Sequence, residues 1–96
     1  MSKTFSIDQT AEGDLRIKSG QDIILFKAAR EEIWKNEILF ASYEALEGIT
    51  VNEVRELYQM EMRFSEDQKL IITEPISGDK MKMLVQKVWD YLGLEM

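Results

Sequence analysis

Catalysis near neutral pH usually depends on residue types that this sequence does not contain. Its 96 residues include no histidine and no cysteine. Histidine is the ordinary proton shuttle, the cysteine thiolate is a strong nucleophile, and both are favoured zinc ligands. Acid–base chemistry would therefore need a carboxylate pair or a lysine whose pKa is shifted by its surroundings. We expect a non-enzymatic protein without catalytic residues.

One short run gathers side-chain oxygens that could bind Ca²⁺ or Mg²⁺, the segment Ser65-Glu66-Asp67-Gln68. The run is shorter than a calcium-binding loop and lacks its spaced acidic ligands. Serine, aspartate and charged residues are also ordinary components of turns. The sequence contains no glycine-rich phosphate-binding loop and no Gly-x-Ser-x-Gly turn. We predict a solvated turn at residues 65–68, with no metal ion and no cofactor.

The net charge of −6 is concentrated in the middle of the chain. Residues 31–78 contain eleven acidic and four basic side chains, while the flanking segments are close to neutral. An acidic surface repels nucleic-acid phosphates and acidic membranes, so we expect neither as a direct partner. With no apolar run of about 18 residues and no signal peptide in view, the expected location is the cytoplasm.

The first two predicted elements of the chain are strands that form an antiparallel hairpin. Residues 4–9 and 14–18 both alternate apolar and polar side chains, as strands with one buried face do. Gly13 lies between them, where a turn requires a positive φ. In this hairpin Asp8 and Arg16 can face each other on the polar side.

Residues 23–47 are interpreted mainly as a helix, because no glycine or proline interrupts them before Gly48. At 100° per residue the apolar side chains fall on two sides, with Phe26, Ile33 and Phe40 on one and Leu39 and Leu46 nearly opposite. Such a helix is either packed on two sides or not continuous. The alternatives are a strand at residues 23–26 and a bend after Asn36.

The second half of the chain predicts a short helix, a second hairpin and a long C-terminal helix. Thr50 and Glu53 have the spacing of a capping box, which favours a helix over Val51–Tyr58. Alternation then indicates a strand at residues 60–64, and β-rich residues 69–73 return as its partner.

The C-terminal helix begins after Ser77 and ends before Gly93, where a left-handed cap is expected. Its apolar residues share one face at helical spacing and comprise Met81, Leu84, Val85, Val88, Trp89 and Leu92. We expect Leu84, Val88 and Trp89 to be buried. Met83 falls on the opposite side of this helix, where it can belong to an exposed patch.

These elements predict a single α+β domain over residues 1–96, in the order ββ-α-α-ββ-α. Its small antiparallel sheet consists of two hairpins, with two to three helices packed mainly on one face. Such a sheet covers one side of the two-sided middle helix, so the other side needs a further cover. The remaining helices, a second copy of the chain or a foreign partner can bury this other side. A homodimer is a natural choice, because symmetric dimers are the commonest soluble oligomers.

The expected function is that of a small acidic protein–protein interaction module, such as an adaptor, an inhibitor or an accessory subunit. Its partner is a protein whose identity the sequence does not reveal, and a homodimer is one form of it. The alternative is a nucleic-acid-mimicking inhibitor. The candidate interaction surface combines exposed apolar and acidic side chains, namely Leu39, Leu46, Met83, Glu44, Glu47, Glu53 and Glu56.

One segment also resembles a known family. The run Gly13-Asp-Leu-Arg-Ile-Lys-Ser-Gly20, followed by Asp22 and the expected helix, is similar to the opening of some phage baseplate wedge subunits. The similarity covers less than a third of the chain, and nothing after Phe40 extends it. It implies an accessory subunit of a larger assembly, such as a phage structural component.

Overall fold

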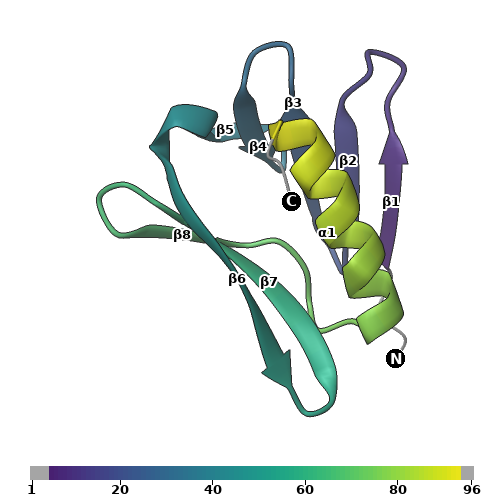
Figure 1. Cartoon of the computed structure of the whole chain (residues 1–96). Coiled ribbons are helices and arrows are strands. Elements are labelled where there is room, and N and C mark those ends of the chain that lie inside the picture. The colour runs from purple at the N-terminus through teal and green to yellow at the C-terminus, as the bar shows by residue number, and fades with distance from the viewer. Residues whose placement is uncertain (1–4, 94–96) are drawn as a thin grey trace.

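The computed structural model describes residues 5–93, which form two antiparallel sheets and one helix (Figure 1). The first sheet is a five-stranded meander of β1 (Phe5–Gln9), β2 (Leu15–Ser19), β3 (Asp22–Lys27), β4 (Glu32–Lys35) and β5 (Ile38–Ser42). The second sheet has three strands, β6 (Leu46–Val54), β7 (Leu57–Phe64) and β8 (Gln68–Ile71). A 3₁₀ turn, η1 (Tyr43–Ala45), joins the two sheets, and α1 (Gly78–Leu92) follows β8.

The predicted order ββ-α-α-ββ-α, with two to three helices, is wrong. Residues 23–47 form β3, β4, β5 and η1 instead of a helix, and residues 51–58 form the end of β6, a turn and the start of β7. The protein is therefore mostly β, with eight strands and one α-helix in the described part of the chain. The alternatives of a strand at residues 23–26 and a bend after Asn36 are confirmed.

The missed strands are separated by turns that contain no glycine. A two-residue hairpin turn of type I′ needs a positive φ at both central residues, and Asn-Gly usually supplies it. Here Asn36 and Glu37 have φ of 50° and 69°, and Arg55 and Glu56 have φ of 51° and 69°. Because left-handed backbone is unfavourable for most residues other than glycine and asparagine, Glu37, Arg55 and Glu56 give no signal for these turns. The turn expected at residues 65–68 forms at residues 65–67, with Glu66 at φ 63°, and Gln68 already begins β8.

Three other predicted elements are confirmed. Strands β1 and β2 pair antiparallel with Asp8 opposite Arg16, and Gly13 in their turn has φ 89°. Residues 60–64 lie in β7, and the partner strand predicted at residues 69–73 is β8, which spans Gln68–Ile71 and pairs with Glu61–Phe64. The helix α1 begins at the cap residue Ser77, whose hydroxyl accepts a hydrogen bond from the Lys80 N–H, and ends at Gly93 in left-handed conformation.

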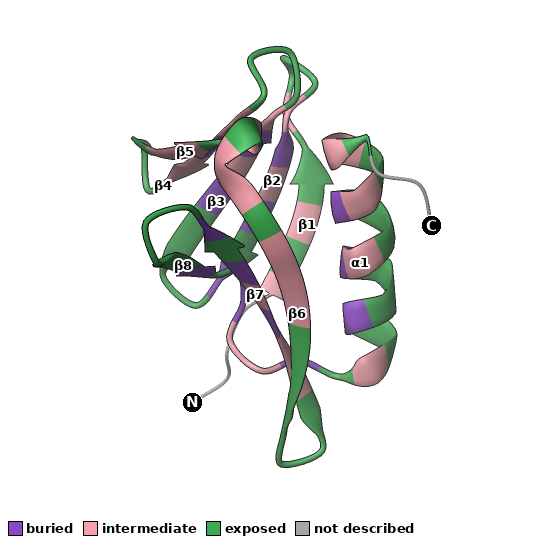
Figure 2. Ribbon diagram, turned by 60° about the vertical axis from the view of Figure 1, so that its left-hand side comes forward, coloured by how far each residue is buried: buried purple, intermediate pink, exposed green. Residues whose placement is uncertain are grey.

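The hydrophobic core lies between the inner faces of the two sheets and one side of α1, which packs against β2 and β7 (Figure 2). Strand β7 contributes Met60, Met62 and Phe64, each no more than 1% exposed. Other enclosed side chains come from β2, β3, β4, β8, α1 and the segment between β8 and α1, and they include Ile17, Ile24, Phe26, Ile33, Leu70, Ile72, Leu84 and Val88. Trp89, which we expected to be buried, is only partly buried and packs at the edge of this core.

The end of the β6–β7 hairpin projects beyond this core. We call residues 51–58 the hairpin arm. Both views show it extending past the helix and the five-stranded sheet (Figures 1 and 2). Val51, Val54 and Leu57 of the arm are therefore 38–40% exposed, while Tyr58 at its base pairs with Ile76 and packs against the core.

Candidate functional site

The outer face of the five-stranded sheet, which points away from the core, carries apolar side chains at its centre. An antiparallel sheet with one face on the core usually presents polar residues on the other face. Here β3, β4 and β5 instead place four apolar residues together, Ile23, Leu25, Trp34 and Leu39, which we call the outer strip. Leu39 is 48% exposed and Ile23 38%, and the other two are partly buried. The strip is thus accessible to a partner.

The strand register explains why these residues meet. Directly opposed residues on neighbouring strands form one row across all five strands, which runs Asp8, Arg16, Leu25, Trp34, Leu39. Opposed side chains on one face lie about 4.5–5.5 Å apart at Cβ, so Trp34 has a leucine on either side. Ile23 lies in the next row, opposite Lys18. The row of Leu25, Trp34 and Leu39 and the row of Ile23 are neighbours on the outer face, so the apolar surface is continuous.

A β-bulge in β5 turns Leu39 outward. Ile33 pairs with Ala41 but Trp34 pairs with Leu39, so Phe40 is an extra residue on β5. Phe40 faces the core, where its ring packs edge-on against Phe64 with centroids 5.3 Å apart. Bulges redirect side chains at sheet edges in this way. Because of the bulge, Leu39 contributes to the outer strip and the next residue, Phe40, contributes to the core.

The indole of Trp34 is held in place by two neighbours. Its Nε1–H donates a hydrogen bond to Oε1 of Glu32 at 3.1 Å. The ammonium of Lys27 lies 4.6 Å from the centroid of the Trp34 rings, within range of a cation–π interaction. A side chain that is fixed before a partner arrives loses little conformational entropy on binding. Trp34 is therefore suited to anchor a partner.

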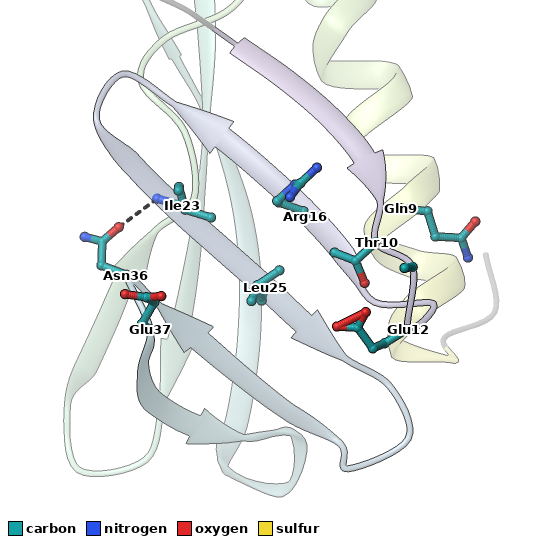
Figure 3. A pocket seen from close by; sticks show the side chains of 9 residues that line it. Gln9, Thr10, Glu12, Arg16, Ile23, Leu25, Asn36 and Glu37 are labelled. Atoms are coloured by element: carbon teal, nitrogen blue, oxygen red, sulfur yellow. Dashed lines mark hydrogen bonds between the residues drawn. The ribbon is translucent and has the colours of Figure 1, made fainter.

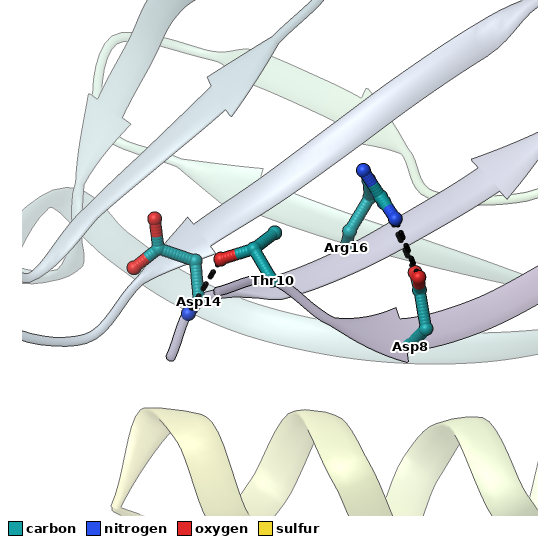
Figure 4. A network of polar contacts seen from close by, with 4 residues as sticks. All are labelled: Asp8, Thr10, Asp14 and Arg16. Carbon is teal, nitrogen blue, oxygen red and sulfur yellow. Dashed lines mark hydrogen bonds and ion pairs between the residues drawn. The ribbon is translucent and has the colours of Figure 1, made fainter. Parts of the chain in front are cut away.

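An ion pair forms the polar end of the row (Figure 4). The guanidinium of Arg16 donates two hydrogen bonds to the carboxylate of Asp8, at 3.1 and 2.5 Å. The hydrogen bond from Arg16 lowers the pKa of Asp8, and the same bond raises the pKa of Arg16. Figure 4 shows both side chains pointing away from α1, so this pair belongs to the outer face.

A hollow of about 720 Å³ borders the outer strip (Figure 3). Its floor includes Arg16, Ile23 and Leu25, and its walls are the β1–β2 turn and the β4–β5 turn. Asn36 fixes the second wall, because its Oδ1 accepts a hydrogen bond from the Ile23 N–H at 2.8 Å and its Nδ2 donates to Asp22 at 3.1 Å. The hollow has a mixed lining, in which Ile23 and Leu25 lie beside polar and charged side chains.

The structure does not bring the predicted interaction residues onto one surface. Leu39 lies in the outer strip, but Met83 is 43% exposed on α1, on another part of the molecule. The acidic candidates Glu44, Glu47, Glu53 and Glu56 are exposed along η1, β6 and the following turn. Leu46, which we expected on the interaction surface, is partly buried and packs against the core.

Metal ligands and shifted pKa values are the features of residues 5–93 that bear most directly on chemistry. Within residues 5–93 no three acidic side chains lie close enough together to hold a metal ion. The most perturbed phenol is that of Tyr43, whose pKa burial raises to about 12, helped by the negative charges of Glu31 and Asp14. Its hydroxyl donates a hydrogen bond to the Tyr91 carbonyl at 3.2 Å, so it ties η1 to the end of α1. No helix in this part of the chain has the length and apolar character needed to cross a membrane.

Comparison with known proteins found no relative. No protein-family model, no curated protein and no solved structure matches this chain.

Proposed function

We propose that this protein is a non-enzymatic, cytoplasmic protein–protein interaction module that binds its partner through the outer strip. The observation that supports the proposal is the row of Leu25, Trp34 and Leu39 on the sheet face opposite the core. Apolar patches on a soluble protein mark interaction sites when they are contiguous and rimmed by polar residues. Tryptophan is also among the residues that contribute most to binding energy at interfaces. The module acts as an adaptor, an inhibitor or an accessory subunit of a larger assembly.

The surroundings of the strip favour a protein partner over a nucleic acid. Among residues 5–93, the basic side chains on this face are Arg16, Lys18 and Lys27. Arg16 is already paired with Asp8, and Lys27 lies over Trp34 and opposite Glu32. Phosphate binding needs several basic side chains that can release counterions, and this face supplies few. A protein partner that places an apolar side chain on the outer strip and a carboxylate near Lys18 suits this face better than a nucleic acid does.

Affinity capture with two matched variants tests the proposal. Leu39→Lys places a charge in the outer strip, while Met83→Lys places the same charge at a similarly exposed position on α1. We expect Leu39→Lys to reduce capture of a partner from extracts of the producing cells by at least about tenfold, since burying an unpaired charge is costly. We expect Met83→Lys to retain it. Equal capture by the two variants would contradict the proposal.

The same experiment at high salt separates apolar docking from charge mimicry. The Debye length falls to about 3 Å at 1 M salt, so contacts that depend on surface carboxylates weaken. Binding through the outer strip should persist there. Capture that disappears in 1 M salt and is unaffected by Leu39→Lys would instead support the nucleic-acid-mimicking inhibitor.

A further inference from the structure

Strand β6 is an edge strand with an accessible backbone. Among the described residues it pairs with β7 on one side and with no strand on the other. It is nine residues long, and its second half lies in the hairpin arm, which extends beyond the body of the protein (Figure 2). An edge of this length exposes a row of N–H and C=O groups that a further strand can pair with.

The middle of β6 lacks the usual protection of an edge strand. Natural edges are blocked by charged side chains, by proline, by bulges or by a covering element, and the two charges of β6, Glu47 and Glu53, lie outside residues 49–51. The only bulge in β6 is at its start, between Leu46 and Gly48. The following residues, Ile49, Thr50 and Val51, are uncharged and β-branched, which favours strand pairing. Val51 is 40% exposed. The open edge is therefore competent to bind another strand.

The turn after β6 determines which backbone groups face this open edge. Val54 pairs with Leu57 across the two-residue turn, and residues that flank such a turn form a hydrogen-bonded pair. Hydrogen-bonded and non-hydrogen-bonded pairs then alternate along the strand. The backbone groups of Ile49, Val51 and Glu53 consequently point away from β7, toward the open edge.

We propose that this edge pairs antiparallel with β6 of a second copy of the chain, around a two-fold axis at Val51. In this register Val51 faces Val51 of the second copy, Thr50 faces Asn52, and Glu47 comes beside Arg55. Three pairs with outward-facing backbone groups would exchange about six hydrogen bonds. The two three-stranded sheets would become one continuous six-stranded sheet.

The charges of β6 favour this register over its neighbours. A two-fold axis at Thr50 would place Glu47 opposite Glu53 twice, and like charges directly opposite each other destabilise a strand pair. An axis at Asn52 would place Arg55 opposite Ile49, so Glu47 would have no opposite charge beside it. Of these three axes, only the one at Val51, which places Glu53 opposite Ile49, brings Glu47 together with Arg55 of the following turn at both ends. This self-complementary pattern is why a second copy, rather than an unrelated strand, is the occupant.

Light scattering coupled to size exclusion, at protein concentrations from 5 to 500 μM, tests the dimer. We expect the wild-type mass to approach twice 11.2 kDa as the concentration rises. Val51→Lys places two ammonium groups opposite each other across the axis, and we expect it to raise the dimer dissociation constant at least about tenfold. Leu57→Lys changes an equally exposed residue of the arm that lies on β7, and the dimer should persist.

Charge exchange tests the register. Glu47→Arg or Arg55→Glu alone should weaken the dimer, and the double variant should restore it, because the opposite-charge pairs reform. A wild-type mass that stays at 11.2 kDa throughout would overturn the proposal, as would a dimer unaffected by Val51→Lys. A double variant weaker than both single variants would overturn the register. The Leu39→Lys variant should still form the dimer, and the Val51→Lys variant should still capture the partner. The dimer and the proposed function can therefore be refuted independently of each other.

Discussion

Phe64→Ala is expected to lower the free energy of unfolding by about 3–5 kcal/mol, the range for a large-to-small change in a packed core. Phe64 is 1% exposed on β7 and packs edge-on against Phe40 from the other sheet. The substitution removes a contact that joins the two sheets and leaves a cavity behind. Domains of this size are stable by only about 5–15 kcal/mol, so much of the stability would be lost. The midpoint of urea unfolding measures the effect.

Leu57→Ala is the matched control for this prediction. Leu57 begins the same strand but is 40% exposed in the hairpin arm. Its truncation should therefore cost much less, within about 1 kcal/mol, as surface substitutions usually do. If both variants unfolded at the same urea concentration, the inner face of β7 would not line the core between the two sheets as described.

Leu84→Ala is expected to cost about 2–5 kcal/mol, because Leu84 is fully enclosed where α1 packs against the sheets. Met83 is its sequence neighbour but is 43% exposed, so Met83→Ala should change stability by no more than about 0.5 kcal/mol. Chemical denaturation of the pair reports which side of α1 faces the core. A larger loss for Met83→Ala than for Leu84→Ala would mean that the helix is rotated about its axis.

Elements whose side-chain period is unambiguous could be predicted from the sequence. The helix α1 repeats apolar residues at helical spacing between a serine cap and Gly93, and both caps form as expected. The β1–β2 hairpin has alternation on both strands and a glycine in its turn. Local sequence alone contains these signals, because the period, the cap and the turn residue agree with one another.

The middle of the chain could not be predicted, because its turns lack the usual residues. Residues 28–31, Ala-Ala-Arg-Glu, favour a helix by intrinsic propensity but form the turn between β3 and β4. Glu37 and Arg55 adopt left-handed backbone that glycine or asparagine would ordinarily supply. Pairing with neighbouring strands outweighs these local preferences, and such long-range pairing is not visible in a short window of sequence.

The candidate site was only partly visible for the same reason. The helical wheel separated Leu39 from Ile33, and the structure also places them on opposite sides, but as residues of neighbouring strands. Leu25 and Trp34 were missed as partners of Leu39, because their proximity depends on a register across three strands and on the bulge at Phe40. The signal that could have found Leu25 is the apolar run Ile23–Phe26, because four successive apolar residues in a strand place apolar side chains on both faces of the sheet.

Site-specific photo-crosslinking inside the producing cells tests the proposed function most directly. A benzophenone amino acid would replace Leu39 in the outer strip or, as the control, the similarly exposed Met83 on α1. If the outer strip binds a partner, irradiation should yield a discrete product heavier than the chain from position 39, and little or none from position 83. The same product from both positions, or no product from position 39, would contradict binding through the outer strip.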